Sequence, residues 1–187
     1  FTGTGKTRLG MEYAVDCLLR DEDDPLVIWV AQKSELLDQA CDSMEQLWPW
    51  LGQESGKALR VYRYWGATRF SPELPEQPTL VVASSQQLLA RTQANDPFAS
   101  AILSRARLLV IDEAHHALAA GHQGIIAAYE GAGDRRTRRT LGLSATPGRS
   151  NLVQLSWDSR PRLSNAAPFA AGNALLPTGC ATLGRSQ

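Results

Sequence analysis

The stretch Leu108-Leu109-Val110-Ile111-Asp112-Glu113-Ala114-His115-His116 decides how the rest of this chain is interpreted. Its run of consecutive apolar residues is typical of a strand buried on both faces, as in the middle of a parallel sheet. Asp112 and Glu113 follow at the point where that strand would end. Because ligands of open α/β sheets bind beyond the carboxyl ends of the strands, the two carboxylates are expected to face a ligand.

A short motif at the start of the chain gives the carboxylate pair a chemical partner. Thr2-Gly3-Thr4-Gly5-Lys6-Thr7 reads as the second half of a phosphate-binding loop, although a flexible Gly/Thr terminus is an alternative interpretation. Backbone amides from Gly3 to Lys6 would surround the phosphates, Lys6 would reach the β- and γ-phosphates, and the Thr7 hydroxyl would ligate Mg²⁺. Together with a carboxylate pair for hydrated magnesium, the loop predicts a site for ATP or another nucleoside triphosphate.

Composition places this site in an ordinary soluble domain. The chain has 187 residues and a formal net charge of zero, which suits one α/β domain and argues against binding nucleic acid by bulk charge. Its three cysteines, Cys17, Cys41 and Cys180, show no metal-ligand spacing and are expected to be free thiols. We find no apolar run of membrane-spanning length and no signal segment, so a cytoplasmic protein without a membrane partner is expected.

The beginning of the chain also predicts something about its extent. A complete phosphate loop opens with a glycine that would lie just before Phe1, and it follows a buried strand. We therefore expect a fragment that lacks the strand before the loop.

Apolar runs and apolar helical stripes alternate along the chain, which predicts a parallel sheet with helices on both faces. Strands are expected over 26–31, 59–65, 79–83, 108–111 and 140–143. A helix should follow the loop, with its inward stripe at Met11, Ala14, Val15, Leu18 and Leu19. Further helices should begin near 34, 84 and 97 and cover 125–129. Ser34 and Asp96 are predicted to cap their helices, and Pro49 to end the second helix.

Some residues have a functional and a structural interpretation, and for each the structural one is preferred. Trp48 and Trp50 could stack on bases, but packing in the core or a loop is favoured. The basic cluster at 134–139 could touch nucleic acid, but a solvated turn is favoured. His116 and His122 are interpreted as core or surface histidines.

With these motifs in place, the chain resembles the first RecA-like domain of superfamily 2 helicases and translocases. Thr2-Gly3-Thr4-Gly5-Lys6-Thr7 is similar to motif I, Asp112-Glu113-Ala114-His115 to the DEAH form of motif II, and Leu143-Ser144-Ala145-Thr146-Pro147 to motif III. The resemblance covers residues 1–150 and is nearest to the branch of type III restriction subunits and DNA-repair helicases. It implies an α/β RecA-like P-loop NTPase domain that acts on nucleic acid, with DNA favoured over RNA.

The resemblance also implies a role for each motif residue. Asp112 would hold Mg²⁺ through water, Glu113 would orient and deprotonate the attacking water, and Lys6 would bind the phosphates. His115 would connect the nucleotide site to motif III or to the partner domain. Ser144 and Thr146 would relay the nucleotide state to the nucleic-acid face.

Two weaker matches would supply the nucleic-acid contacts. The segment 31–39, with Gln32 and Lys33, resembles motif Ia, and the segment 82–88, with Ser84 and Ser85, resembles motif Ib. By resemblance both would grip strand phosphates with amides and hydroxyls, which suits a neutral domain. Ordinary helix capping is the alternative role of the two serines.

The family implies a second RecA-like domain, which supplies an arginine to the transferred phosphoryl group, and nothing after Pro147 resembles it. From Asn151 to the end, lysine and glutamate are absent and no periodicity holds, so 151–187 is expected to be an irregular or disordered tail, with a frameshift suspected. The alternatives to a helicase half are a nucleotide-dependent binding module without turnover, an inactive fragment, or a small-molecule P-loop kinase. The intact Glu113 counts against the first, and the DEAH and Ser-Ala-Thr runs against the last.

Overall fold

The computed structural model describes residues 5–20, 25–52, 55–114, 120–134 and 137–144, where helices and strands alternate. The helices are α1 (Lys6–Arg20), α2 (Ser34–Leu51), α3 (Ser85–Gln93), α4 (Pro97–Arg105) and α5 (Ala120–Gly131). The strands are β1 (Leu26–Ala31), β2 (Arg60–Tyr64), β3 (Thr79–Ser84), β4 (Leu108–Ile111) and β5 (Arg139–Gly142). In these ranges no helix is both long and apolar enough to cross a membrane.

The strands form one sheet in the order β2-β3-β1-β4-β5, and every neighbouring pair is parallel. β1 lies between β3 and β4, and all of its residues are buried, as expected for the centre of a parallel sheet. Because all the strands run the same way, their carboxyl ends lie along one edge of the sheet. The predicted α/β fold with a parallel sheet is therefore confirmed.

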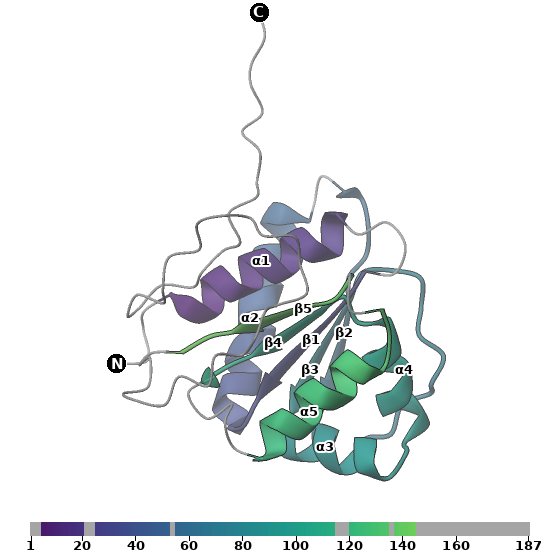
Figure 1. Cartoon of the computed structure of the whole chain (residues 1–187). Helices are drawn as coiled ribbons and strands as arrows, with labels where there is room; N and C mark the ends of the chain where they lie inside the picture. Colours follow the sequence, from purple (N-terminus) through teal and green to yellow (C-terminus); the bar gives the residue numbers. More distant parts are fainter. Residues whose placement is uncertain (1–4, 21–24, 53–54, 115–119, 135–136, 145–187) are drawn as a thin grey trace, which may run out of the picture.

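Helices cover both faces of the sheet, as Figure 1 shows: α1 and α2 lie on one side, and α3, α4 and α5 on the other. Alternation along β1 sends Val27, Trp29 and Ala31 into the apolar cluster under α1 and α2. The remaining β1 side chains, Leu26, Ile28 and Val30, enter the cluster under the other helices. The stripe predicted for α1 is buried there, except that Leu19 is half-buried.

The ends of α2 differ from the sequence prediction. Pro49 lies inside the helix, which continues to Leu51, and the Gly52 N–H donates to the Trp48 oxygen at 2.8 Å. A proline in the last turn removes only one N–H donor, so the turn can still close around it. At the other end Lys33, and not Ser34, is the N-cap, and its side chain makes no capping bond. The Asp96 cap of α4 is confirmed, because its Oδ1 accepts from the Ala99 N–H at 2.9 Å.

The basic cluster before β5 is only partly the solvated turn that the charge run predicts. Arg138 is 8% exposed. Its guanidinium donates to the carbonyl oxygens of Ser104 and Tyr129, near the C-terminal ends of α4 and α5, and lies over the Tyr129 ring at 4.7 Å from the centroid. A cation is favoured at helix C-termini, where carbonyl groups lack partners, which explains why this arginine is buried.

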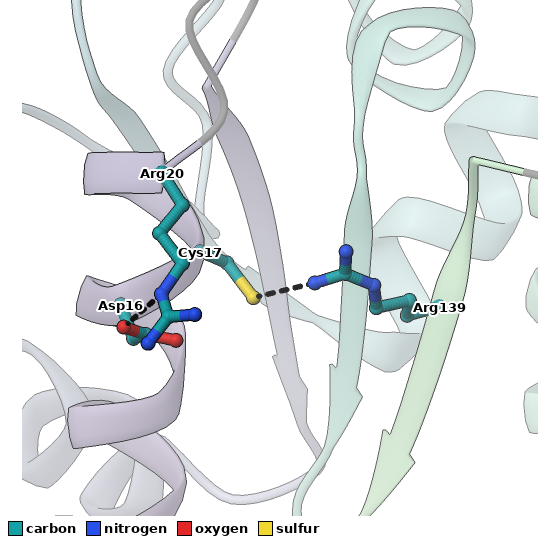
Figure 2. A network of polar contacts seen from close by, with 4 residues as sticks. All are labelled: Asp16, Cys17, Arg20 and Arg139. Atoms are coloured by element: carbon teal, nitrogen blue, oxygen red, sulfur yellow. Dashed lines mark hydrogen bonds and ion pairs between the residues drawn. The ribbon is translucent and has the colours of Figure 1, made fainter. Parts of the chain in front are cut away.

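The next residue, Arg139, connects β5 to α1, which lies on the other face of the sheet from α4 and α5. Figure 2 shows its side chain reaching across to Cys17, with the Arg139 Nη1 at 3.5 Å from the Cys17 Sγ. One residue away, Asp16 and Arg20 form an ion pair of 2.6 Å along the outer side of α1. The helix that carries Lys6 and Thr7 is thus held against the strand that leads to Ser144.

Candidate active site

The phosphate-loop residues that the structure describes are Gly5, Lys6 and Thr7, whereas Thr2, Gly3 and Thr4 lie outside the described residues. Gly5 has a φ of 70°, a left-handed conformation that glycine adopts without strain. The helix begins directly after it, and the Leu9 N–H donates to the Gly5 oxygen at 2.9 Å. Lys6 and Thr7 are half-buried in the first turn of α1, where amide groups and the helix dipole favour an anion.

The carboxylate pair lies where β4 ends, as the sequence predicts. The Asp112 N–H donates to the Val30 oxygen of β1 at 2.8 Å, so the backbone leaves the sheet only after this residue. The Asp112 side chain is buried, at 3% exposure, and its Oδ1 accepts from the Glu113 N–H at 2.9 Å. Its Oδ2 is buried and makes no hydrogen bond within the described part of the chain.

Burial also sets the electrostatics of Asp112. Removal from water raises the pKa of this carboxyl from its ordinary value of 3.8 to about 6. The hydrogen bond from the Glu113 N–H opposes that rise, and the negative charge of Glu113 adds to it. The positive charge of Lys6 also lowers the pKa of Asp112. The loop and the carboxylate turn, which are more than a hundred residues apart in the chain, therefore act on each other in the fold.

Glu113 is held in an uncommon backbone conformation. Its φ is 54°, in the left-handed region, where a residue with a side chain costs roughly 1 kcal/mol or more. Its side chain is half-buried. Such outliers persist only where surrounding contacts determine them, and they are often found at functional sites.

The strand β5 brings the third motif to the same place. The Ala114 N–H, directly after the carboxylate pair, donates to the Leu143 oxygen at 2.6 Å. Ser144 is half-buried just beyond β5. His115 and Thr146 lie outside the described residues. The sequence places Ala114 in motif II and Leu143 in motif III but gives neither residue a role. The close pairing of β4 with β5 shows that their backbone groups join the two motifs.

The predicted nucleic-acid contacts lie along the same edge of the sheet. Gln32 and Lys33 are exposed just after β1, Ser84 is half-buried at the end of β3, and Ser85 is buried. The two segments are adjacent, since Ala31 pairs with Ser84 in the sheet register. The N-cap side chains of α2 and α3, Lys33 and Ser84, make no capping hydrogen bond, which leaves the capping role of Ser84 without support.

The residues present fit a magnesium ion. Mg²⁺ takes oxygen ligands and usually keeps several waters, so one or two protein oxygens together with phosphates complete its shell. A buried carboxylate oxygen without a hydrogen bond is costly, and within the described ranges the Oδ2 of Asp112 is such an atom. In the described ranges no group of three or more His, Cys, Asp or Glu side chains could hold a metal alone. The donor set therefore suits a cation that arrives with a phosphate ligand.

The raised pKa of Asp112 predicts how the metal-free domain responds to pH. Its folded-state pKa of about 6 lies above the ordinary value of 3.8, so the folded state binds the proton first as pH falls. Wild-type protein should therefore gain roughly 1–3 kcal/mol of stability relative to Asp112→Asn between pH 7 and pH 4. Chemical unfolding of both proteins without Mg²⁺ would measure the difference. The exposed Asp38→Asn is the control and should follow wild type; a constant gap between wild type and Asp112→Asn would contradict the prediction.

Comparison with known proteins shows which family this chain matches. Residues 1–155 match the DEAD/DEAH box helicase family. A solved S. cerevisiae complex, described as variant Dbp5 bound to Nup159, variant Gle1, IP6 and ADP, contains a chain with a similar fold. The TM-score is 0.54 at 17% sequence identity, and the match covers 79% of this chain and 36% of the solved chain. This chain therefore spans about a third of the length of the solved chain.

Other comparisons add little. The Archaeoglobus fulgidus hydrogenase maturation factor HypB matches at 11% identity and a TM-score of 0.29, over 75% of this chain and 90% of that one, and such a likeness carries no argument. No curated protein matches the sequence. The family match covers the loop, the carboxylate turn and the end of β5, which are the parts that the fold brings together. This chain therefore belongs to the DEAD/DEAH box helicase family.

Proposed function

We propose that this domain binds ATP with Mg²⁺ and, joined to a second RecA-like domain, hydrolyses it to drive movement on nucleic acid. The observation that carries the proposal is the Asp112 carboxylate, which is buried beyond a central strand. One of its oxygens has no hydrogen-bond partner among the described residues, and the charge of Lys6 lowers its pKa. A buried charge without a partner destabilises a fold, so its presence is best explained by a ligand.

The chemistry divides among a few side chains. Lys6 would bind the terminal phosphates, and Thr7 and Asp112 would hold Mg²⁺, which neutralises phosphate charge when bound. Glu113 would accept a proton from water as the water oxygen bonds to the γ-phosphorus. The bond from that phosphorus to the bridging oxygen of ADP breaks in the same reaction, so ADP and phosphate leave. An arginine side chain from the second domain would further stabilise the negative charge on the transferred phosphoryl group.

The nucleic-acid face is proposed at the adjacent N-termini of α2 and α3. Helix N-termini with uncapped amides attract phosphates, and the hydroxyls of Ser84 and Ser85 and the charge of Lys33 would add further donors. Contacts of this kind read the backbone and not the bases. They suit DNA and RNA alike, and the preference for DNA comes only from the motif resemblance. Ser144, beside the Leu143 backbone, is proposed to pass the nucleotide state to this face.

The nucleotide assignment is tested by substituting Lys6. In the full-length protein, Lys6→Ala should weaken ATP binding by roughly 10–100-fold, because a charged hydrogen-bond donor to phosphate is lost. Titration with a fluorescent ATP analogue in Mg²⁺ would measure this. Lys57→Ala is the matched control, since Lys57 is exposed in the turn before β2.

Equal affinity of Lys6→Ala and wild type would contradict the site. Hydrolysis should then be measured with single-stranded DNA and with single-stranded RNA of the same length and sequence. Stimulation by either supports coupling to nucleic acid, and the stronger one identifies the substrate. ATP binding without any hydrolysis, with or without nucleic acid, would instead favour a binding module without turnover.

A further inference from the structure

We propose that Gly142 and Leu143 form a backbone clamp that positions Glu113, the proposed general base, by holding its left-handed backbone conformation. The inference rests on the proposed function for its catalytic consequence, but the clamp itself can be observed without ATP. Gly142 lies outside the three motifs, and the sequence predicts only that it is part of a strand.

Leu143 binds the chain on both sides of the carboxylate pair. Its N–H donates to the Ile111 oxygen at 2.9 Å, and its own oxygen accepts from the Ala114 N–H at 2.6 Å. The backbone leaves β4 and returns to the same residue of the neighbouring segment. Asp112 and Glu113 are therefore enclosed between two hydrogen bonds to a single residue, while the Asp112 N–H is fixed to Val30 on the other side.

This close return requires a glycine at position 142. Gly142 pairs with Ile111 in the parallel register, which places it beside the turn. A Cβ atom at Gly142 would lie 2.9 Å from the Cβ of Ala114, closer than real Cβ atoms approach. One of the two segments would have to move. The atom in the way belongs to a short, rigid side chain, so a rotamer change cannot relieve the contact.

The clamp explains why Glu113 can remain at a φ of 54°. A conformation that costs roughly 1–3 kcal/mol persists when neighbouring contacts over-determine it. Here the contacts are the Ala114–Leu143 bond after Glu113 and the bond from its own N–H to Asp112 Oδ1 before it. If the turn relaxed, the Glu113 side chain would point in another direction.

Gly142→Ala should consequently reduce kcat more than it affects nucleotide binding. A displacement of about 1 Å at a reacting group can cost up to about a hundredfold in rate, so we expect kcat to fall by roughly 10–100-fold. The KM for ATP should change by less than about threefold, because Lys6 and Thr7 hold the phosphates from α1. Gly131→Ala is the control, as a Cβ there would meet no described atom of the chain within 4 Å.

Two double variants separate positioning from general damage to the fold. Adding Ala114→Gly to Gly142→Ala removes the opposing methyl group and should restore kcat to within about threefold of Ala114→Gly alone. In a Glu113→Gln background, Gly142→Ala should lower kcat no further, because the group it displaces is already inactive. A full additional loss there, or no rescue by Ala114→Gly, would overturn the positioning role.

Amide hydrogen exchange tests the clamp directly. In unsubstituted protein without nucleotide, the Ala114 amide should exchange as slowly as the amides of β4, and Gly142→Ala should speed it by about tenfold or more. Fast exchange of Ala114 in the unsubstituted protein would refute the clamp even if Gly142→Ala failed to fold. A protected Ala114 in a full-length protein that hydrolyses no ATP, with or without nucleic acid, would keep the clamp and refute the proposed function.

Discussion

Replacing Glu113 with glutamine should slow ATP hydrolysis by roughly 10²–10⁴-fold, the usual contribution of a general base. Glutamine keeps the size and much of the hydrogen bonding of the side chain, but it cannot accept the proton of the attacking water. The affinity for ATP should stay close to wild type, since the proposed phosphate contacts come from α1. Steady-state hydrolysis and nucleotide titration of the full-length protein would provide both quantities.

The matched control for this variant is Glu76→Gln, which makes the same change at an exposed position in the loop before β3. It should leave both turnover and affinity unchanged. Unchanged turnover in Glu113→Gln itself would remove Glu113 from the catalytic assignment. A similar loss in both variants would point to an effect of net charge.

The second large effect concerns what residues 1–187 can do alone. We expect their ATP hydrolysis to lie roughly 10³–10⁵-fold below that of a protein in which a second RecA-like domain contributes its arginine. Addition of single-stranded DNA or RNA should not stimulate it, because the coupling that we propose needs the second RecA-like domain. ATP hydrolysis measured with and without each nucleic acid, against a protein-free blank, would test this.

That experiment needs a check that the isolated chain is folded. Amide exchange of β1 serves, because this strand is buried on both faces and should be among the slowest to exchange. Robust stimulation of turnover by nucleic acid would show that these residues suffice. Weak hydrolysis from a chain with a protected β1 would support the need for a second domain.

Most of the fold could be predicted because its signals are local. The run at 108–111 and the run at 26–31 are short, apolar and bounded, and both are buried strands at those positions. The α1 stripe likewise follows from helical spacing. The prediction that Pro49 ends α2 was wrong because proline is strongly disfavoured in a helix interior but is tolerated better in a last turn. The sequence alone does not say which turn of the helix Pro49 occupies.

The candidate site could be predicted in its residues but not in its arrangement. Asp112 and Glu113 are recognisable from their position after a strand, whereas the bond from Ala114 to Leu143 depends on which strands are neighbours and in what register. The burial of Arg138 also depends on which segments the fold brings together, so the sequence could not predict it. A run of charges predicts exposure on average, and only the fold shows that two helix C-termini meet beside this one arginine.

The central place of β1 has a consequence for synthesis on the ribosome. Its partner on one side, β3, ends at Ser84, and its partner on the other side, β4, ends at Ile111, so both lie far downstream. While the nascent chain is shorter than this, the apolar segment Leu26–Ala31 has at least one backbone edge without a strand beside it. Unpaired apolar strands of this kind are sites of aggregation and of chaperone binding. The domain therefore needs protection from the time β1 is made until Ile111 has been added, and most of all before Ser84, while both edges of β1 are unpaired.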